Sequence, residues 1–220
     1  MKKSNVLLVI YQRLYKHYGP QRWWPADSPF EVMVGAILTQ SAAWQNVEKG
    51  INNLKASDAL SSLALRQLPL EEIARLIHPC GYFNAKARKL KALANWLSEA
   101  CDDNLGRLFT TETGELRKQL LAVHGVGPET ADSILLYAAK KPVFVIDAYT
   151  CRIIARLGLA PEKETYDDYQ RLFMQDLPSD VQLFNEYHAL LVRLGKTVCQ
   201  KQPLCEKCCL FDIGPYYESR

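Results

Sequence analysis

Apolar positions along the chain recur mostly at helical spacing. The strongest run is 30–40, FEVMVGAILTQ, which Ser28 or Asp27 can cap. A second run, 181–194, carries apolar residues three and four positions apart, as expected for a helix with one buried face. Further helices are predicted over 6–15, 71–77, 84–97, 149–157 and 166–173. The pattern therefore predicts a series of helices, with 143–146 as a short extended segment.

Two stretches add polar character to this pattern. Segment 101–114 is polar and acidic and is expected to be a connecting loop. The predicted helix over 84–97 carries four basic residues between Lys86 and Lys91. Such a run is typical of a solvated face, and contact with phosphate is the alternative.

A glycine pair interrupts the helical pattern within 120–138. The segment 124–127, His-Gly-Val-Gly, favours a tight turn because two glycines fall within three residues. Pro128 then suits the first residue of a new helix, where its missing N–H costs nothing. Free amides at a helix start attract an anion, and a nucleic-acid phosphate is the natural one. A packing turn between two helices is the alternative interpretation.

Composition limits the possibilities without naming a function. The 220 residues suit one domain or two closely packed ones, and 48% hydrophobic residues suffice for a core. A net charge of +3 is too small to establish a nucleic-acid partner. The apolar run 6–10 is too short for a signal peptide, and nothing approaches the roughly 18 apolar residues of a membrane span. A cytoplasmic protein is expected.

The seven cysteines divide into two groups. Three lie scattered in predicted helices and are expected to be buried small hydrophobic residues: Cys80, Cys101 and Cys151. The other four crowd together near the C-terminal end: Cys199, Cys205, Cys208 and Cys209. In a chain without an export signal, such a cluster indicates a metal rather than disulfides.

The glycine turn also carries a family resemblance. Residues 125–127 with Thr130-Ala131, followed by Val145-Ile146-Asp147, resemble the helix-hairpin-helix of the endonuclease III superfamily of DNA glycosylases. The resemblance implies an all-α fold of two helical lobes with a cleft between them. It implies that Asp147 is the catalytic carboxylate at the mouth of the base pocket. The DNA-binding residues of the hairpin would be Gly125, Val126, Gly127 and Thr130.

The same resemblance implies a division of the chain. One lobe would be the central segment 25–125. The other would combine 1–24 with 126–220, so that both termini complete it. The hairpin 120–138 would lie at the junction, and the cysteine loop 199–209 would close the second lobe.

Other segments narrow the resemblance to one branch. They are Trp23-Trp24-Pro25, 35–40 (GAILTQ), 81–87 (GYFNAKA) and 125–129 (GVGPE), in that order. Together they resemble the 3-methyladenine DNA glycosylase III branch over most of the chain. Carried over, the branch implies that Trp24 or Trp23 stacks with Trp44 on a flipped base. For the Trp-Trp pair, the alternative is packing in the seam between lobes.

A residue that fills the gap left by a flipped base is also expected. Gln40 follows an apolar helix in a polar turn, which suits a side chain inserted into the minor groove. The alternative for Gln40 is a helix-end residue bonded to local backbone. We therefore predict Gln40 as a base-site residue.

The catalytic prediction combines three residues. Endonuclease III relatives form a Schiff base with a lysine two residues after the second hairpin glycine, where this chain has Glu129. Because glutamate cannot form a Schiff base, a monofunctional enzyme is predicted. Asp147 would stabilise charge on the sugar and orient water. Glu129 at the pocket edge and Lys196 behind Asp147 complete the set; their alternatives are a first-turn carboxylate and a helix-end cation.

The cysteine loop implies a cofactor. Endonuclease III relatives carry a four-cysteine [4Fe–4S] loop at this place. Here the first gap is one residue shorter, and the fourth ligand position holds Gly214, which cannot ligate. A substitute ligand in Cys209, a degenerate loop, and zinc are open alternatives. An iron–sulfur cluster bound by Cys199, Cys205, Cys208 and Cys209 is favoured, with the role of fixing a basic loop against DNA.

The expected function is a monofunctional DNA glycosylase of base excision repair. Its substrate would be an everted alkylated purine such as 3-methyladenine, in double-stranded DNA containing the damaged base. An endonuclease III-like glycosylase for oxidised pyrimidines or mismatches is one alternative. A non-catalytic DNA-binding protein with the same hairpin is another. A monomer located in the cytoplasm, on the nucleoid through its DNA binding, is expected.

Overall fold

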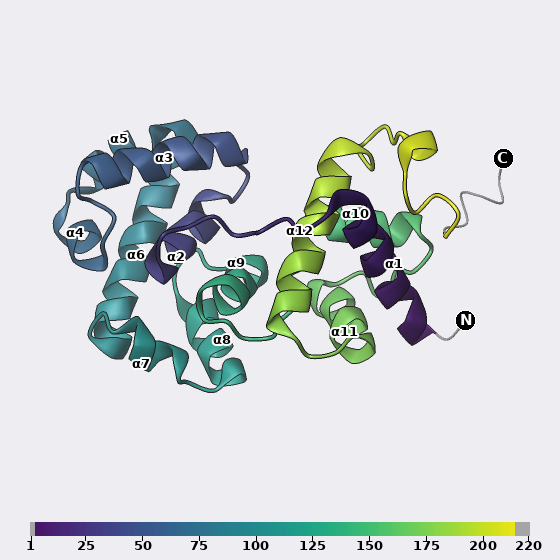
Figure 1. The fold of residues 1–220 in the computed structure, drawn as a ribbon. Coiled ribbons are helices and arrows are strands. Elements are labelled where there is room, and N and C mark those ends of the chain that lie inside the picture. Colours follow the sequence, from purple (N-terminus) through teal and green to yellow (C-terminus); the bar gives the residue numbers. More distant parts are fainter. Residues whose placement is uncertain (1–2, 214–220) are drawn as a thin grey trace. The chain divides into compact units, whose positions relative to one another are not determined.

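The computed structural model describes residues 3–213, and within this range it contains helices and no strand (Figure 1). The all-α prediction is confirmed. The chain forms two compact units. One unit is the continuous segment Ala26–Lys141, and the other combines the chain up to Pro25 with the chain from Pro142 onward.

The continuous unit, called here the central unit, holds most of the helices. They are α2 (Pro29–Leu38), α3 (Trp44–Ala56), α4 (Ser62–Gln67), α5 (Leu70–Leu76), the 3-10 helix η1 (His78–Cys80), α6 (Phe83–Cys101), α7 (Leu105–Phe109), α8 (Thr113–Ala122), α9 (Pro128–Ser133) and the π-helix η2 (Ile134–Ala138).

The unit built from both ends of the chain is called here the terminal unit. Its helices are α1 (Lys3–Tyr18), α10 (Ala148–Arg156), α11 (Tyr166–Asp176), α12 (Val181–Thr197) and the 3-10 helix η3 (Cys205–Lys207). In residues 3–213, every helix is too short or too polar to cross a bilayer.

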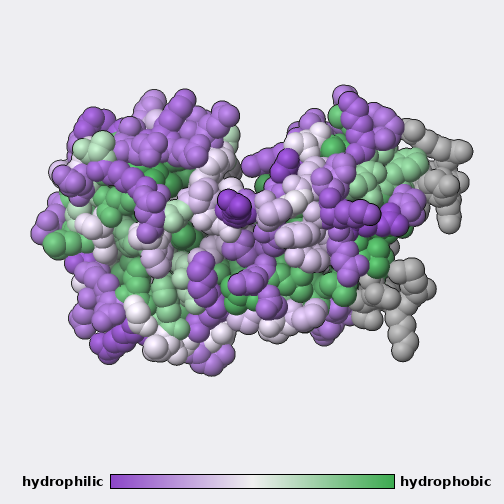
Figure 2. Space-filling model, in the orientation of Figure 1, coloured by the Kyte–Doolittle hydropathy of each residue, from purple (hydrophilic) through white to green (hydrophobic). Residues whose placement is uncertain are grey.

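Helix α2 forms the core of the central unit. All its residues from Glu31 to Leu38 are buried, and it packs against α3, α6, α9 and η2. Its cap is Ser28, whose hydroxyl accepts a hydrogen bond from the Glu31 amide at 3.2 Å. In the view of Figure 2, hydrophilic residues cover α3, whose buried face points to this core.

The packing of α9 and η2 on α2 explains where the units divide. The sequence predicts the return to the second lobe at 126, whereas the structure changes unit between Lys141 and Pro142. The helix after the glycine turn buries Ala131, Ile134 and Leu135 against central-unit helices. The whole hairpin therefore belongs to the central unit.

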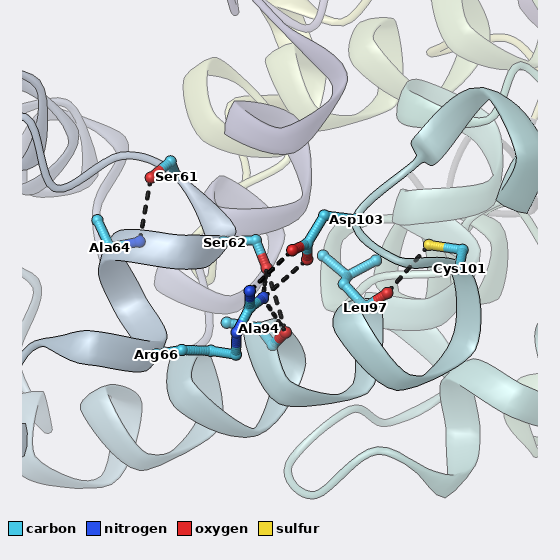
Figure 3. Close-up of polar contacts among 8 residues, drawn as sticks. All are labelled: Ser61, Ser62, Ala64, Arg66, Ala94, Leu97, Cys101 and Asp103. Atoms are coloured by element: carbon cyan, nitrogen blue, oxygen red, sulfur yellow. Dashed lines mark hydrogen bonds and ion pairs between the residues drawn. The ribbon is translucent and has the colours of Figure 1, made fainter.

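The far end of α6 is tied to α4 by an arginine fork (Figure 3). The guanidinium of Arg66 donates to both carboxylate oxygens of Asp103 at 2.8 Å, to the Ser62 hydroxyl at 2.9 Å and to the Ala94 carbonyl at 3.2 Å. A two-point bond of this kind holds a planar fork in one orientation. It anchors the C-terminal turn of α6 where the chain leaves the helix.

The prediction of a loop over the whole of 101–114 was wrong, because Cys101 still belongs to α6 and α8 already begins at Thr113. A short helix, α7, also lies within this segment, and the side chain of Asn104 caps α7 by accepting from the Arg107 amide at 3.0 Å. Leu108 is buried. One capping side chain and one buried apolar residue are enough to order the single turn of α7, which the polar composition of the segment did not predict.

The terminal unit is organised around an aromatic cluster. The Phe144 ring stacks on Phe173 at 4.0 Å between centroids, while Phe184 and Tyr187 meet Phe144 edge-on. The Tyr187 hydroxyl donates to the Leu7 carbonyl at 2.8 Å, which joins α12 to α1. The segment 143–146 is thus buried core, and it delivers the next residue, Asp147, from a fixed position.

Candidate active site

Asp147 begins helix α10 as its N-cap. Its backbone is extended (φ −119°, ψ 176°), and its Oδ1 accepts a hydrogen bond from the Thr150 amide at 2.7 Å. Its side chain is only 11% exposed. The carboxylate is therefore held in one orientation by the helix that it caps.

His188 lies against the other oxygen of the same carboxylate. Its Nε2 is 3.6 Å from Oδ2 of Asp147, and its side chain, on the buried face of α12, is 8% exposed. Burial opposes ionisation of Asp147, but the contact with His188 and the bond from Thr150 outweigh it and lower the pKa of Asp147 below its ordinary value. The carboxylate is thus held in its charged form.

Sequence reasoning missed His188. The available signal was a single histidine among the apolar positions of α12, where it takes a place otherwise used for packing. The predicted neighbour, Lys196, is exposed eight residues further along the same helix. The side chain that the structure brings to Oδ2 of Asp147 is that of His188.

The tryptophans lie in different units. Trp23 and Trp24 are half-buried in the terminal unit, with ring centroids 5.2 Å apart and planes inclined by 51°. Trp44 is the first residue of α3 in the central unit and is also half-buried. All three residues keep part of their surface accessible, although the indole nitrogens of Trp23 and Trp24 are buried.

The glycine turn connects α8 and α9 as a hairpin, and its two glycines differ. Gly125 has φ +82°, a left-handed backbone, and a Cβ there would collide with the aliphatic stem of Lys89. Gly127 has φ −95° and caps α9, and a Cβ there would meet nothing. Pro128 is the first residue of α9, as predicted.

Gln40 bridges to this hairpin. Its side-chain amide donates to the Gly125 carbonyl at 3.0 Å and to the Thr130 hydroxyl at 2.9 Å. Its Oε1 accepts a hydrogen bond from the Lys89 ammonium. The turn after α2, the hairpin and α6 thus meet at one side chain, and Gln40 must leave these bonds before it can fill a gap in DNA.

A polar pocket lies beside this bridge in the central unit. Its lining residues come from the α2 turn and the start of α9: Ala36, Thr39, Gln40, Ser41, Glu129, Thr130 and Ser133. Glu129 is exposed in the first turn of α9, so its carboxylate borders the pocket. Hydroxyl groups and one carboxylate can recognise a ligand that donates hydrogen bonds or carries positive charge.

These features agree with the comparison to known families. A model described as "HhH-GPD superfamily base excision DNA repair protein" matches residues 34–179, which include the hairpin and Asp147. The chain belongs to this superfamily. The expected resemblance to helix-hairpin-helix DNA glycosylases is confirmed at that level.

Individual relatives of this HhH-GPD protein cover nearly the whole chain. It is 44% identical over 207 residues to a provisionally named DNA repair glycosylase of Methanocaldococcus jannaschii, with 94% of each chain covered. A solved H. pylori 3-methyladenine DNA glycosylase bound to 1,N6-ethenoadenine is 27% identical, has a TM-score of 0.76, and covers 89% of this chain and 98% of its own. An endonuclease III–DNA complex has a TM-score of 0.85 at 20% identity, with 100% and 99% covered, which shows a shared fold.

The HhH-GPD protein exposes an aromatic residue that sequence reasoning missed. Tyr82 is 75% exposed and caps α6 in a left-handed conformation (φ 44°, ψ 31°), directly after Gly81. Left-handed backbone is unfavourable for a residue with a Cβ, and such strain often accompanies function. The signal in the sequence was a bulky aromatic placed at a glycine break between two helices.

Lys86 does not lie on a solvated face. It is 2% exposed, and its ammonium donates to the Leu38 and Cys80 carbonyls at 2.9 and 2.8 Å. The expectation of an exposed basic run was therefore wrong at this position. Helical spacing turns Lys86 inward, on the same face as Leu90 and Leu93.

The cysteine loop gathers three of its four predicted ligands. Cys199, Cys205 and Cys208 line one largely apolar pocket in the terminal unit, and Cys209 is not among its lining residues. Burial raises the pKa of Cys208, and the neighbouring thiols raise it further; burial raises that of Cys209 to about 11. Thiolates are the donors that iron–sulfur clusters and zinc take, and binding of either at this loop stays a prediction.

The fourth ligand position is not described. Gly214 lies outside the described residues. Within 3–213, no group of three or more His, Cys, Asp or Glu side chains is close enough together to hold a single metal ion. Arg156 secures the loop by donating to the Cys199 sulfur at 3.3 Å and to the Gln200 carbonyl at 2.6 Å.

Proposed function

We propose that this HhH-GPD protein is a monofunctional DNA glycosylase that hydrolyses the N-glycosidic bond of an everted alkylated purine such as 3-methyladenine. Membership of a base excision DNA repair superfamily supports the reaction class. The observation that carries the chemical assignment is the buried carboxylate of Asp147, which its neighbours keep ionised.

Asp147 supplies the chemistry in this proposal. As the base leaves, positive charge grows on the sugar ring, and a fixed carboxylate in a protected site stabilises that charge far more than one in water. The Thr150 amide holds one oxygen and His188 faces the other, so the group needs no reorganisation during the reaction. The same carboxylate can orient the attacking water.

Glu129 supports a hydrolytic rather than a lyase reaction. A Schiff base needs an amine at the sugar C1′ carbon. The residue two positions after Gly127 carries a carboxylate instead, at the rim of the polar pocket. Water is then the nucleophile, and the product is an abasic site in an unbroken strand.

The lining of the polar pocket supports an alkylated purine. Such a base carries positive charge or amino hydrogens, and Glu129, Ser41 and Thr39 offer acceptors. A charged purine leaves readily and needs little help from a general acid. The indoles of Trp23, Trp24 and Trp44 would supply the flat surfaces on which an everted base stacks.

Two side chains of the central unit are suited to filling the gap in the duplex. Gln40 lies in the turn after α2, and Tyr82 lies directly before α6 with 75% of its surface exposed. An apolar or aromatic wedge inserted between base steps keeps a flipped nucleotide out of the stack. We assign this role to Tyr82 together with the predicted Gln40.

The proposal includes a [4Fe–4S] cluster in the cysteine loop. Cys199, Cys205 and Cys208 would hold it, with Cys209 or another group completing the set. When bound, the cluster would supply rigidity rather than chemistry, since four thiolates fix the loop that binds them. Arg156 and Arg152 already hold this loop through its backbone carbonyls.

Two assays test the proposed function. Purified protein incubated with alkylated duplex DNA is expected to release methylated purines, detected by chromatography. Borohydride added during the reaction is expected to trap no covalent protein–DNA adduct. Strong trapping would overturn the monofunctional assignment, and release of oxidised pyrimidines in place of methylated purines would favour an endonuclease III-like specificity.

One observation favours a second function, a DNA-binding protein without catalysis. Asp147 caps α10 in the same way that Asp180 caps α12. Each Oδ1 accepts a hydrogen bond at 2.7 Å from the backbone amide three residues later. A pure cap needs no catalytic role. Binding to duplex DNA with no excision of any damaged base would support this second function.

A further inference from the structure

The most completely buried cation of the described central unit is the ammonium of Lys86. Its side chain is 2% exposed, and its Nζ donates to the Leu38 carbonyl at 2.9 Å and the Cys80 carbonyl at 2.8 Å. A buried charge is costly unless hydrogen bonds compensate it, and burial indeed lowers the pKa of Lys86. A buried ammonium is therefore expected to have a structural or functional role.

Both acceptors are the last carbonyls of helices. Leu38 ends α2, and Cys80 ends η1. Carbonyls at a helix end have no partner within the helix and take one from outside. One ammonium therefore joins the ends of two helices to α6, the helix that carries it.

The positions of these carbonyls give the contact its meaning. Gln40 lies two residues after Leu38, and Tyr82 lies two residues after Cys80. The carbonyls that precede the two turns with the candidate inserting side chains therefore accept hydrogen bonds from the same ammonium group. Lys86 therefore links the two turns, in addition to the packing of η1 on α3 and of α2 on α3 and α6.

We propose that Lys86 is a positioning residue for DNA insertion, which holds the Gln40 and Tyr82 turns in a single fixed arrangement. The inference rests on the proposed function, because only a protein that everts a nucleotide needs both side chains registered to one gap. A misplacement of about 1 Å in such an arrangement is enough to cost on the order of a hundredfold in rate.

Lys89, one helical turn further along α6, extends the arrangement to the hairpin. Its ammonium donates to Gln40 Oε1, and its stem lies over Gly125. The two lysines act on different atoms. Lys89 holds the Gln40 side chain, which has to leave on insertion, whereas Lys86 holds main-chain carbonyls that can stay bonded throughout. Lys86 is therefore the contact that survives when the side chain moves.

The test is a direct measurement of insertion that requires no excision. The probe is a duplex that carries 2-aminopurine opposite a tetrahydrofuran abasic-site analogue. At saturating protein, checked by anisotropy, the wild type is expected to change the 2-aminopurine fluorescence as side chains enter the gap. Lys86→Met, similar in length but uncharged, is expected to lose this change by on the order of tenfold while still binding.

Lys91→Met is the matched control. Lys91 lies on the same helix, and its ammonium also donates to the carbonyl at a helix end, that of Leu68 after α4, at 2.6 Å. No inserting side chain follows that carbonyl closely. The fluorescence change with Lys91→Met at saturating protein is expected to equal that of the wild type. Tyr82→Ala is expected to lose the change, as Lys86→Met does.

The outcomes separate the inference from the function. No fluorescence change with the wild type would overturn the proposed function and this inference with it. A wild-type change that Lys86→Met retains would overturn the inference alone. A merely structural role predicts lowered stability with an unchanged insertion signal in the folded fraction. If Lys86→Met does not fold, Lys86→Arg replaces it, because the bulkier fork keeps the charge but displaces the turns.

Discussion

The Nε2 atom of His188 lies 3.6 Å from Oδ2 of Asp147. Forty residues of chain separate the two, and each comes from a different helix of the terminal unit. The other oxygen of Asp147 caps α10. The carboxylate is thus held from both sides and charged, which gives a candidate catalyst fixed before any DNA binds.

Asp147→Asn is expected to remove excision and keep the fold. Asparagine caps helices as well as aspartate but carries no charge for the developing oxocarbenium ion. Single-turnover release of methylated purine should fall by on the order of 10²–10⁴-fold, with DNA binding unchanged. Asp180→Asn, the same change at the exposed cap of α12, should leave the rate intact. A full rate in Asp147→Asn would remove Asp147 from the chemistry.

The lowered pKa of Asp147 predicts a pH dependence of stability. An unfolded aspartate titrates at about pH 3.9, so the stability contributed by the ionised group is present above about pH 4 and lost as the pH falls through the lower folded pKa. The difference in unfolding free energy between wild type and Asp147→Asn should therefore shrink on acidification. Urea unfolding across the acid range measures it.

Loss of the histidine should move this pH dependence. His188→Gln removes the first of the interactions that lower the pKa of Asp147, so the same difference should shrink at higher pH than with His188 present. His78→Gln is a control, because the His78 ring packs against Phe83 in the central unit, with the two planes inclined by 34°. An unchanged profile in His188→Gln would show that the Thr150 amide alone holds the charge.

The hairpin glycines are expected to respond unequally to alanine. Gly125→Ala adds a Cβ at φ +82° and against the Lys89 stem, which should cost about 1–2 kcal/mol and weaken binding to duplex DNA. Gly127→Ala meets no neighbour and has φ −95°, so its stability should stay close to wild type. Urea unfolding and anisotropy compare them. Equal losses would mean that the turn adapts to either side chain.

Substitution of Cys208 and substitution of Cys209 are expected to affect cofactor binding differently. If a cluster is bound, freshly purified protein absorbs in the visible range. Cys208→Ser should abolish the absorbance, because Cys208 lines the loop pocket with Cys199 and Cys205. Cys209→Ser should retain it. Loss of absorbance in Cys209→Ser would show that the loop rearranges to use Cys209 as the fourth ligand, and bound zinc without colour would replace the cluster.

Local pattern was sufficient for much of this protein. Apolar spacing predicted α1, α2, α6, α10, α11 and α12, because a helix of 3.6 residues per turn places residues three and four positions apart on one face. The glycine turn and the aspartate that follows the apolar run pointed to the HhH-GPD superfamily. Those features depend on residues close together in the chain.

Tertiary packing decided the contacts that make the site. The facing of His188 and Asp147, the inward turn of Lys86 and the bridge from Gln40 to Gly125 each join residues far apart in the chain. A histidine in an apolar stripe, or a lysine in a basic run, has the same local sequence whether it meets a partner or not. The packing of one helix on another determines whether such a histidine or lysine is buried and which atom it contacts.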